Sequence, residues 1–102
     1  MEKRPFWALG LVLGAAALSG CSSEKQARAT LAKFEHVFQV CREVTEKQQM
    51  APGKHACSSI ASAALDTTLR DTGIGEDDLR KMRDTWLEQK GYKDLYVPDE
   101  QR

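Results

Sequence analysis

The sequence lacks a hydrophobic run long enough for a membrane-spanning helix. Its longest apolar run, residues 5–20, has about sixteen residues, whereas a spanning helix needs about 20. It also lacks an excess of charge of either sign, since 15 basic side chains balance 15 acidic ones. A near-zero net charge provides no electrostatic reason to bind nucleic acid. We therefore expect no nucleic-acid partner, and we interpret residues 5–20 as something other than a membrane span.

Motifs for catalysis and metal binding are also missing. There is no Gly-rich phosphate loop, no Gly-x-Ser-x-Gly turn and no Ser-His-Asp arrangement. The chain has enough ligands for a metal ion in His36, Cys41, His55 and Cys57. Their spacing, however, differs from the paired spacing typical of structural zinc. The acidic run 76–78 needs no bound metal to explain it, because acidic side chains are favourable at the start of a helix. We predict a protein that is not an enzyme, with no catalytic residue, metal or cofactor.

The N-terminus has the pattern of a secretory signal peptide. Lys3 and Arg4 form a weakly basic start, and the uncharged residues 5–20 follow. The run ends in the small residues Ser19 and Gly20. A basic start, a short apolar stretch and a small-residue end are typical of an exported precursor.

The end of this segment, Leu18-Ser19-Gly20-Cys21, resembles the lipobox of bacterial lipoprotein precursors. The resemblance implies that residues 1–20 are removed, that the Cys21 thiol is diacylated, and that the new amine is often acylated too. Each buried methylene contributes about 0.8 kcal/mol, so two or three chains make a stable anchor in the bilayer. Ser22 stands where an aspartate would imply retention at the inner membrane. The resemblance therefore implies a lipid-anchored protein of the cell envelope, at the outer membrane and facing the periplasm.

The remaining chain, residues 21–102, is predicted to be a single small domain. A core of this size gives little stability, and small domains often carry a covalent staple. If Cys21 is acylated, only Cys41 and Cys57 remain, and paired cysteines usually bridge in an oxidising compartment. We therefore predict a Cys41–Cys57 disulfide. We expect it to be structural, because its spacing does not resemble the redox-active motif in which two residues separate the cysteines.

Three amphipathic segments predict helices at about 23–48, 55–72 and 76–90. In the first, Leu31, Phe34, Phe38 and Cys41 form an apolar stripe, and Ser23 is predicted to be its N-cap. The second ends at a glycine and the third begins after one. A short turn between the first two helices favours an antiparallel hairpin. The predicted fold is all-α: a three-helix bundle built on a disulfide-pinned antiparallel hairpin.

Beyond the third helix, a short aromatic tail is too apolar to be a solvated end. Tyr92, Leu95 and Tyr96 lie in it, and Trp86 precedes it. These side chains either pack on the bundle or form a surface for a partner protein, since Trp and Tyr dominate such surfaces. We expect a partner surface at Trp86, Tyr92, Leu95 and Tyr96.

The function expected from these patterns is that of an accessory or scaffold protein for an envelope assembly of the secretion, pilus or conjugation type. Its partners would be the bilayer, through Cys21, and an envelope protein. In broad architecture the chain is similar to the pilotins of secretin channels. The alternative is an exclusion or inhibitor lipoprotein that blocks a receptor or a conjugation channel. A ligand-binding lipoprotein and an enzyme without a recognisable motif are the remaining possibilities.

Overall fold

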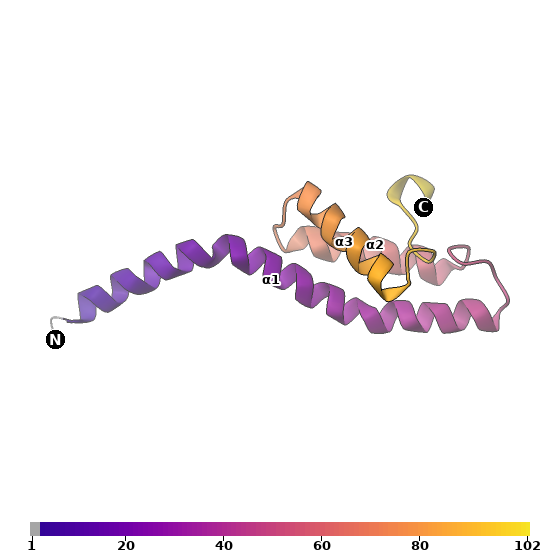
Figure 1. Cartoon of the computed structure of the whole chain (residues 1–102), viewed down its shortest axis with the longest axis horizontal. Helices are drawn as coiled ribbons and strands as arrows, with labels where there is room; N and C mark the ends of the chain where they lie inside the picture. Colours follow the sequence, from indigo (N-terminus) through magenta and orange to yellow (C-terminus); the bar gives the residue numbers. More distant parts are fainter. Residues whose placement is uncertain (1–2) are drawn as a thin grey trace.

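The computed structural model describes the backbone of residues 3–102 and the side chains of residues 22–102. The predicted signal peptide and the Cys21 side chain lie outside the described side chains. Three α-helices and one short 3-10 helix make up the fold, and the described residues contain no strand (Figure 1). The predicted all-α class and the hairpin bundle are confirmed.

Helix α1 (Lys3–Lys47) is the longest element, and it begins far upstream of the start at residue 23 that the sequence pattern predicts. Ser23 lies inside α1 and so cannot have the non-helical backbone of an N-cap. The physical reason is in the printed sequence, where Ala15, Ala16 and Ala17 have the strongest helix propensity and no proline stands between them and Ser23. The helix ends one residue before its predicted end.

Helix α2 (Ala56–Asp71) returns antiparallel to α1 after the turn at residues 48–55. It ends close to Gly73, which has a φ of +85° and so takes the left-handed conformation predicted for it. Helix α3 (Glu76–Lys90) has the predicted bounds and crosses the hairpin obliquely (Figure 1). Gly91 ends it in the left-handed conformation, with a φ of +77°.

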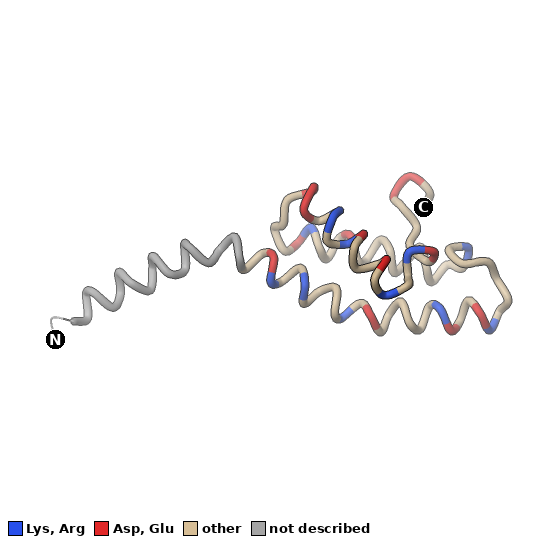
Figure 2. The backbone as a smooth tube through the Cα atoms, viewed as in Figure 1, with Lys and Arg blue, Asp and Glu red and all other residues tan. Residues whose placement is uncertain are grey.

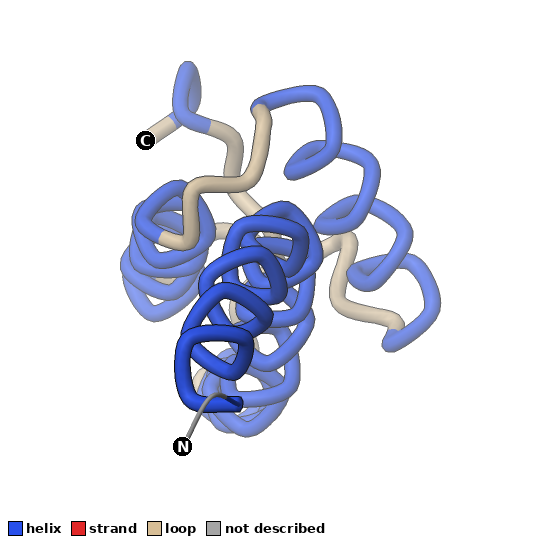
Figure 3. Tube along the Cα trace, turned by 90° about the vertical axis from the view of Figure 1, so that its left-hand side faces the viewer, coloured by secondary structure: helices blue, strands red, loops and turns tan. Residues whose placement is uncertain are grey.

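The core lies between the three helices, which surround a common centre when viewed along the molecule (Figure 3). α1 contributes Leu31 and Phe38 to it, α2 contributes Leu65 and Leu69, and α3 contributes Leu79 and Leu87. The predicted α1 stripe faces inward, with Phe38 and Cys41 fully buried. Acidic and basic residues are interspersed along the described helices (Figure 2). Within the described part of the chain, no helix has the length and apolar character needed to cross a membrane.

The segment after α3 packs back onto α2 and ends in the 3-10 helix η1 (Asp99–Gln101). Leu95 is fully buried and Val97 is 7% exposed. The backbone N–H of Val97 donates to Ser62 Oγ at 2.9 Å, and that hydroxyl donates to the carbonyl of Ser58 at 2.7 Å. The tail is therefore part of the folded domain.

Candidate functional site

The predicted disulfide is present between α1 and the first turn of α2. Cys41 and Cys57 are bonded, with their Cα atoms 5.5 Å apart. Cys41 is fully buried and Cys57 is half-buried. The bond joins the two helices close to the hairpin turn and so fixes their register.

His55 has a structural role that the sequence pattern did not reveal. It is the N-cap of α2, and its Nδ1 accepts a hydrogen bond from the Cys57 N–H at 2.9 Å. Its Nε2 lies 3.1 Å from Gln48 Oε1. An acceptor at Nδ1 requires the proton to be on Nε2, which can then donate to Gln48. His55 therefore connects the hairpin turn to the helix that carries Cys57.

We expect His55→Ala to lower the free energy of unfolding by about 1 kcal/mol, because the first turn of α2 loses its cap. His55→Asn is the matched variant, since asparagine is a preferred N-cap residue and should restore most of the loss. Denaturant unfolding of the two variants measures the difference. Equal loss in both would show that capping is not what His55 contributes.

A bidentate ion pair ties the tail to α1. The Arg42 guanidinium donates to both carboxylate oxygens of Asp94, each at 2.8 Å, and to the Gly91 carbonyl at 2.5 Å. The Arg42 hydrogen bonds hold the pKa of Asp94 below its ordinary value. Paired bonds of this geometry are among the stronger polar contacts in proteins.

An aromatic cluster closes the space between α1, α3 and the tail. The ring centroids of Phe38 and Trp86 are 5.9 Å apart in an edge-to-face arrangement, and those of Phe38 and Tyr92 are 5.7 Å apart and stacked. Trp86 is 9% exposed. Such aromatic pairs contribute about 0.5–1.5 kcal/mol beyond the area they bury.

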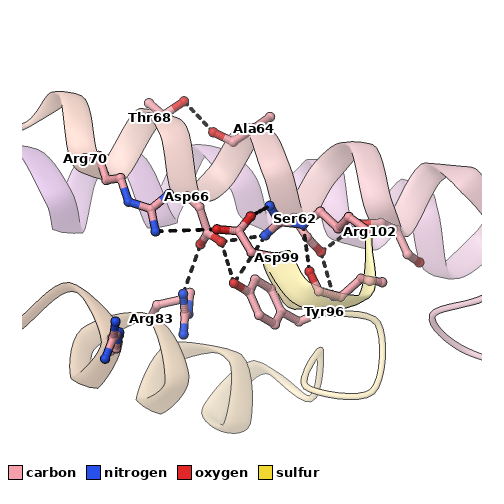
Figure 4. Close-up of polar contacts among 12 residues, drawn as sticks. Ser62, Ala64, Asp66, Thr68, Arg70, Arg83, Tyr96, Asp99 and Arg102 are labelled. Atoms are coloured by element: carbon pink, nitrogen blue, oxygen red, sulfur yellow. Dashed lines mark hydrogen bonds and ion pairs between the residues drawn. The ribbon is translucent and has the colours of Figure 1, made fainter. Parts of the chain in front are cut away.

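Asp66 is the centre of a buried polar network (Figure 4). It lies on α2 with 1% of its surface exposed. Its Oδ1 is 3.2 Å from Arg83 Nη1 on α3, and its Oδ2 is 2.6 Å from Arg102 Nη2. The Tyr96 hydroxyl donates to Oδ2 at 2.5 Å. One buried carboxylate thus joins α2, α3 and two points of the tail, Tyr96 and Arg102.

The surroundings of Asp66 balance its charge and occupy both of its oxygens. Arg102 also donates to the Val97 carbonyl at 2.8 Å and pairs with Asp99. The Arg83 guanidinium lies 4.7 Å from the centre of the Tyr96 ring, a favourable cation–π distance. A carboxylate that is bonded on both oxygens to side chains of three segments holds the structure together.

The same network predicts how stability depends on alkaline pH. Burial, followed by the hydrogen bond to Asp66 and its negative charge, raises the pKa of Tyr96 far above its ordinary value of about 10. In the unfolded chain Tyr96 loses its proton near pH 10, whereas in the folded chain it keeps it. Its contribution is therefore fully present below about pH 10 and is lost as the pH rises toward the folded pKa.

We expect the urea midpoint to fall between pH 9 and pH 11, and Tyr96→Phe to flatten this fall because it removes the titrating group. Tyr92→Phe is the control, since Tyr92 does not bond to Asp66, and it should keep the wild-type slope. If Tyr96→Phe kept that slope as well, the alkaline loss would have to come from another group.

A groove of about 900 Å³ lies between α1 and α3, beside the turn that joins α2 to α3. Leu31, Ile74, Met82 and Trp86 provide its apolar lining. Charged residues stand along it, with Glu24, Arg28, Glu35, Asp78, Lys81 and Lys90 on its rim.

Metal ligands do not gather in the described part of the chain: no three His, Cys, Asp or Glu side chains there form a group that would hold an ion.

No protein family matches the sequence, and neither a curated protein nor a solved structure does. Any functional conclusion therefore depends on the chain's own residues.

The structure places the four predicted partner residues inside the domain. Leu95 is fully buried, Trp86 is 9% exposed, and Tyr92 and Tyr96 are half-buried in the contacts described above. These four side chains belong to the hydrophobic core or pack against it. Among large apolar side chains, the exposed ones are instead Val37 (38%), Val40 (38%), Met50 (40%) and Ile60 (69%). Cys21 lies outside the described side chains, so its predicted lipid stays a prediction.

Proposed function

We propose that this protein is a non-enzymatic lipoprotein, anchored through Cys21, that acts as an accessory or scaffold protein for an assembly in the cell envelope. The observation that carries the proposal is the absence of a spacer between the lipobox and the fold. Ala27, only six residues after Cys21, is already fully buried in the core. Six residues of helix extend about 9 Å, so a lipid on Cys21 would keep the domain against the bilayer.

The partner surface that fits this position is the outer face of the α1–α2 hairpin. Val37 lies four residues before Cys41 and Ile60 three residues after Cys57, so the disulfide holds them at the same level of the hairpin. Ile60 has 69% of its surface exposed, and Val37 has 38%. Exposed apolar residues that gather on one face are typical of protein contact sites.

The anchor is tested by Cys21→Ala. We expect this variant to lose label from an alkyne-bearing palmitate and to leave the membrane fraction of the mature protein, because no thiol remains to be acylated. Cys57→Ala is the control: it removes a cysteine from the domain and should keep the label. Acyl label that persists in Cys21→Ala would contradict the anchor.

The partner surface is tested in the same cells with a photoreactive side chain at Ile60, and in a second strain at Glu88, an exposed position on α3. We expect one discrete protein adduct from position 60 that disappears when Cys21→Ala is added, since the partner would be reached only from the membrane. Adducts of the same protein from both positions, or an adduct independent of the anchor, would contradict this surface.

A further inference from the structure

The groove between α1 and α3 extends to the end of the domain nearest to the proposed anchor. Ser23 and Glu24 line it, two and three residues after Cys21 in the sequence. The α2–α3 turn forms the opposite wall there, since a Cβ added to Gly73 would lie 3.5 Å from Ser23 Oγ. In Figure 1 this turn lies beside α1, on the side of the molecule away from the hairpin turn.

The far end of the groove is crossed by an ion pair. Lys90 Nζ at the end of α3 lies 3.5 Å from Glu35 Oε1 on α1. Between this pair and Ser23, the α1 wall has a length of about 18 Å, at 1.5 Å per residue. A bilayer core is about 30 Å thick, so an acyl chain that fills one leaflet extends about 15 Å. The groove therefore has the length of one acyl chain.

The apolar part of the groove lining fits a hydrocarbon chain, and charged and polar side chains make up much of the rest. Leu31, Ile74, Met82 and Trp86 line it with aliphatic, thioether and aromatic groups, and methionine adapts readily to an irregular ligand. On the rim, Arg28 and Glu24 neutralise each other in a 2.8 Å pair. The volume of about 900 Å³ is within the range of small-molecule sites.

The position of the anchor in the sequence directs a lipid toward this wall. Cys21 precedes Glu24 and Arg28 by three and seven residues, the spacing that repeats one face of a helix. Both of these residues line the groove. This spacing predicts that position 21 shares a helical face with these two residues.

We propose that the groove binds one acyl chain of the lipid attached to Cys21 of the same molecule while the domain is away from a bilayer. This inference depends on the proposed anchor. Immersion of a chain in a bilayer stabilises it by about 0.8 kcal/mol per methylene, more than an open groove provides. The groove is therefore occupied in the aqueous phase and empties when the chains enter a membrane.

The chain contains its own reporter for this occupancy. It has two tryptophans, Trp7 in the signal segment and Trp86 in the groove, so the processed protein retains Trp86 alone. The probe is palmitate with bromine atoms at mid-chain, because bromine quenches tryptophan fluorescence only at contact. Two proteins are compared in detergent-free buffer: the lipidated processed protein, and the full chain with Cys21→Ser and Trp7→Phe.

We expect the probe to quench Trp86 saturably in the Cys21→Ser chain and to leave the lipidated protein unquenched, since its own acyl chain fills the groove. Two further substitutions are compared in the chain that carries Cys21→Ser and Trp7→Phe. Ala32→Phe narrows the groove and should abolish the quenching. Ala29→Phe, at an exposed position outside the groove lining, should not. The mass of the processed protein is measured first. If the mass of the lipid is missing, both the proposed anchor and this inference are wrong.

With the lipid present, three results would overturn the inference alone. The first is absence of quenching in the Cys21→Ser chain, which would show that the groove takes no acyl chain. The second is equal quenching of both proteins, which would leave the attached lipid outside the groove. The third is equal effects of Ala32→Phe and Ala29→Phe, which would place the probe elsewhere.

Discussion

Replacing Asp66 with alanine should lower the free energy of unfolding by about 3 kcal/mol, the lower end of the range for breaking a buried ion pair. The lower end applies because Arg83 and Arg102, with side chains 13% and 16% exposed, still reach water when their partner is lost. A domain of this size has only about 4–12 kcal/mol of stability in total. The expected drop in melting temperature is therefore about 10–20 °C.

The matched control for this change is Asp99→Ala. Asp99 also pairs with Arg102, but its side chain is 63% exposed, and exposed pairs contribute about 0–1 kcal/mol. Asp66→Asn keeps the shape and one acceptor oxygen and should fall between the two. Thermal unfolding by circular dichroism separates the three variants. A melting temperature for Asp66→Ala equal to that of Asp99→Ala would show that the network does not hold the tail to the bundle.

Removing the disulfide is the second large effect. The double variant Cys41→Ala, Cys57→Ala should lose about 3 kcal/mol, the chain-entropy value for a loop of about 15 residues. Cys41 is fully buried, so the lost sulfur also leaves a small unfilled space in the core. Denaturant unfolding of the oxidised protein against the double variant measures the difference.

The reduced wild-type protein is the control that separates the bond from the packing of the sulfur atoms. It should lie between the oxidised protein and the double variant, because it keeps both sulfurs and loses the cross-link. If the oxidised and reduced proteins had the same midpoint, the bridge would contribute nothing to stability, and the register of α1 and α2 would depend on packing alone.

The helices were predictable because their signals are local. The bounds of α3 follow from Gly75, the acidic residues after it and Gly91, all within its own segment. The α1 stripe and the pairing of Cys41 with Cys57 follow from spacing and from the number of cysteines. Only the start of α1 differs, since a capping pattern at Ser23 does not stop a helix when good helix formers precede it.

The contacts that place the tail were not predictable from the sequence. Asp66 meets Arg83, Tyr96 and Arg102 across 17, 30 and 36 residues, and no local pattern specifies such pairs. One signal was present: Asp66 stands between Leu65 and Leu69 on the face of α2 that faces the core. A carboxylate in that position needs a buried cationic partner, so the four arginines that follow it in the sequence were candidates.

The aromatic residues near the C-terminus show where composition stops being decisive. For Trp86, Tyr92, Leu95 and Tyr96 the sequence leaves two interpretations open, packing on the bundle or contact with a partner protein. In the structure, the tail and α3 use these residues to close the core. The groove and the exposed hairpin face depend on how the helices cross, which a sequence pattern does not specify.

The lipid on Cys21 is the claim on which the account of function depends, and intact mass spectrometry of the protein purified from membranes tests it most directly. We predict a chain that begins at Cys21, carries two or three acyl groups on that residue, and is two protons lighter than its reduced form because of the Cys41–Cys57 bond. A chain with an unmodified Cys21, or one that still begins at Met1, would contradict the proposed anchor.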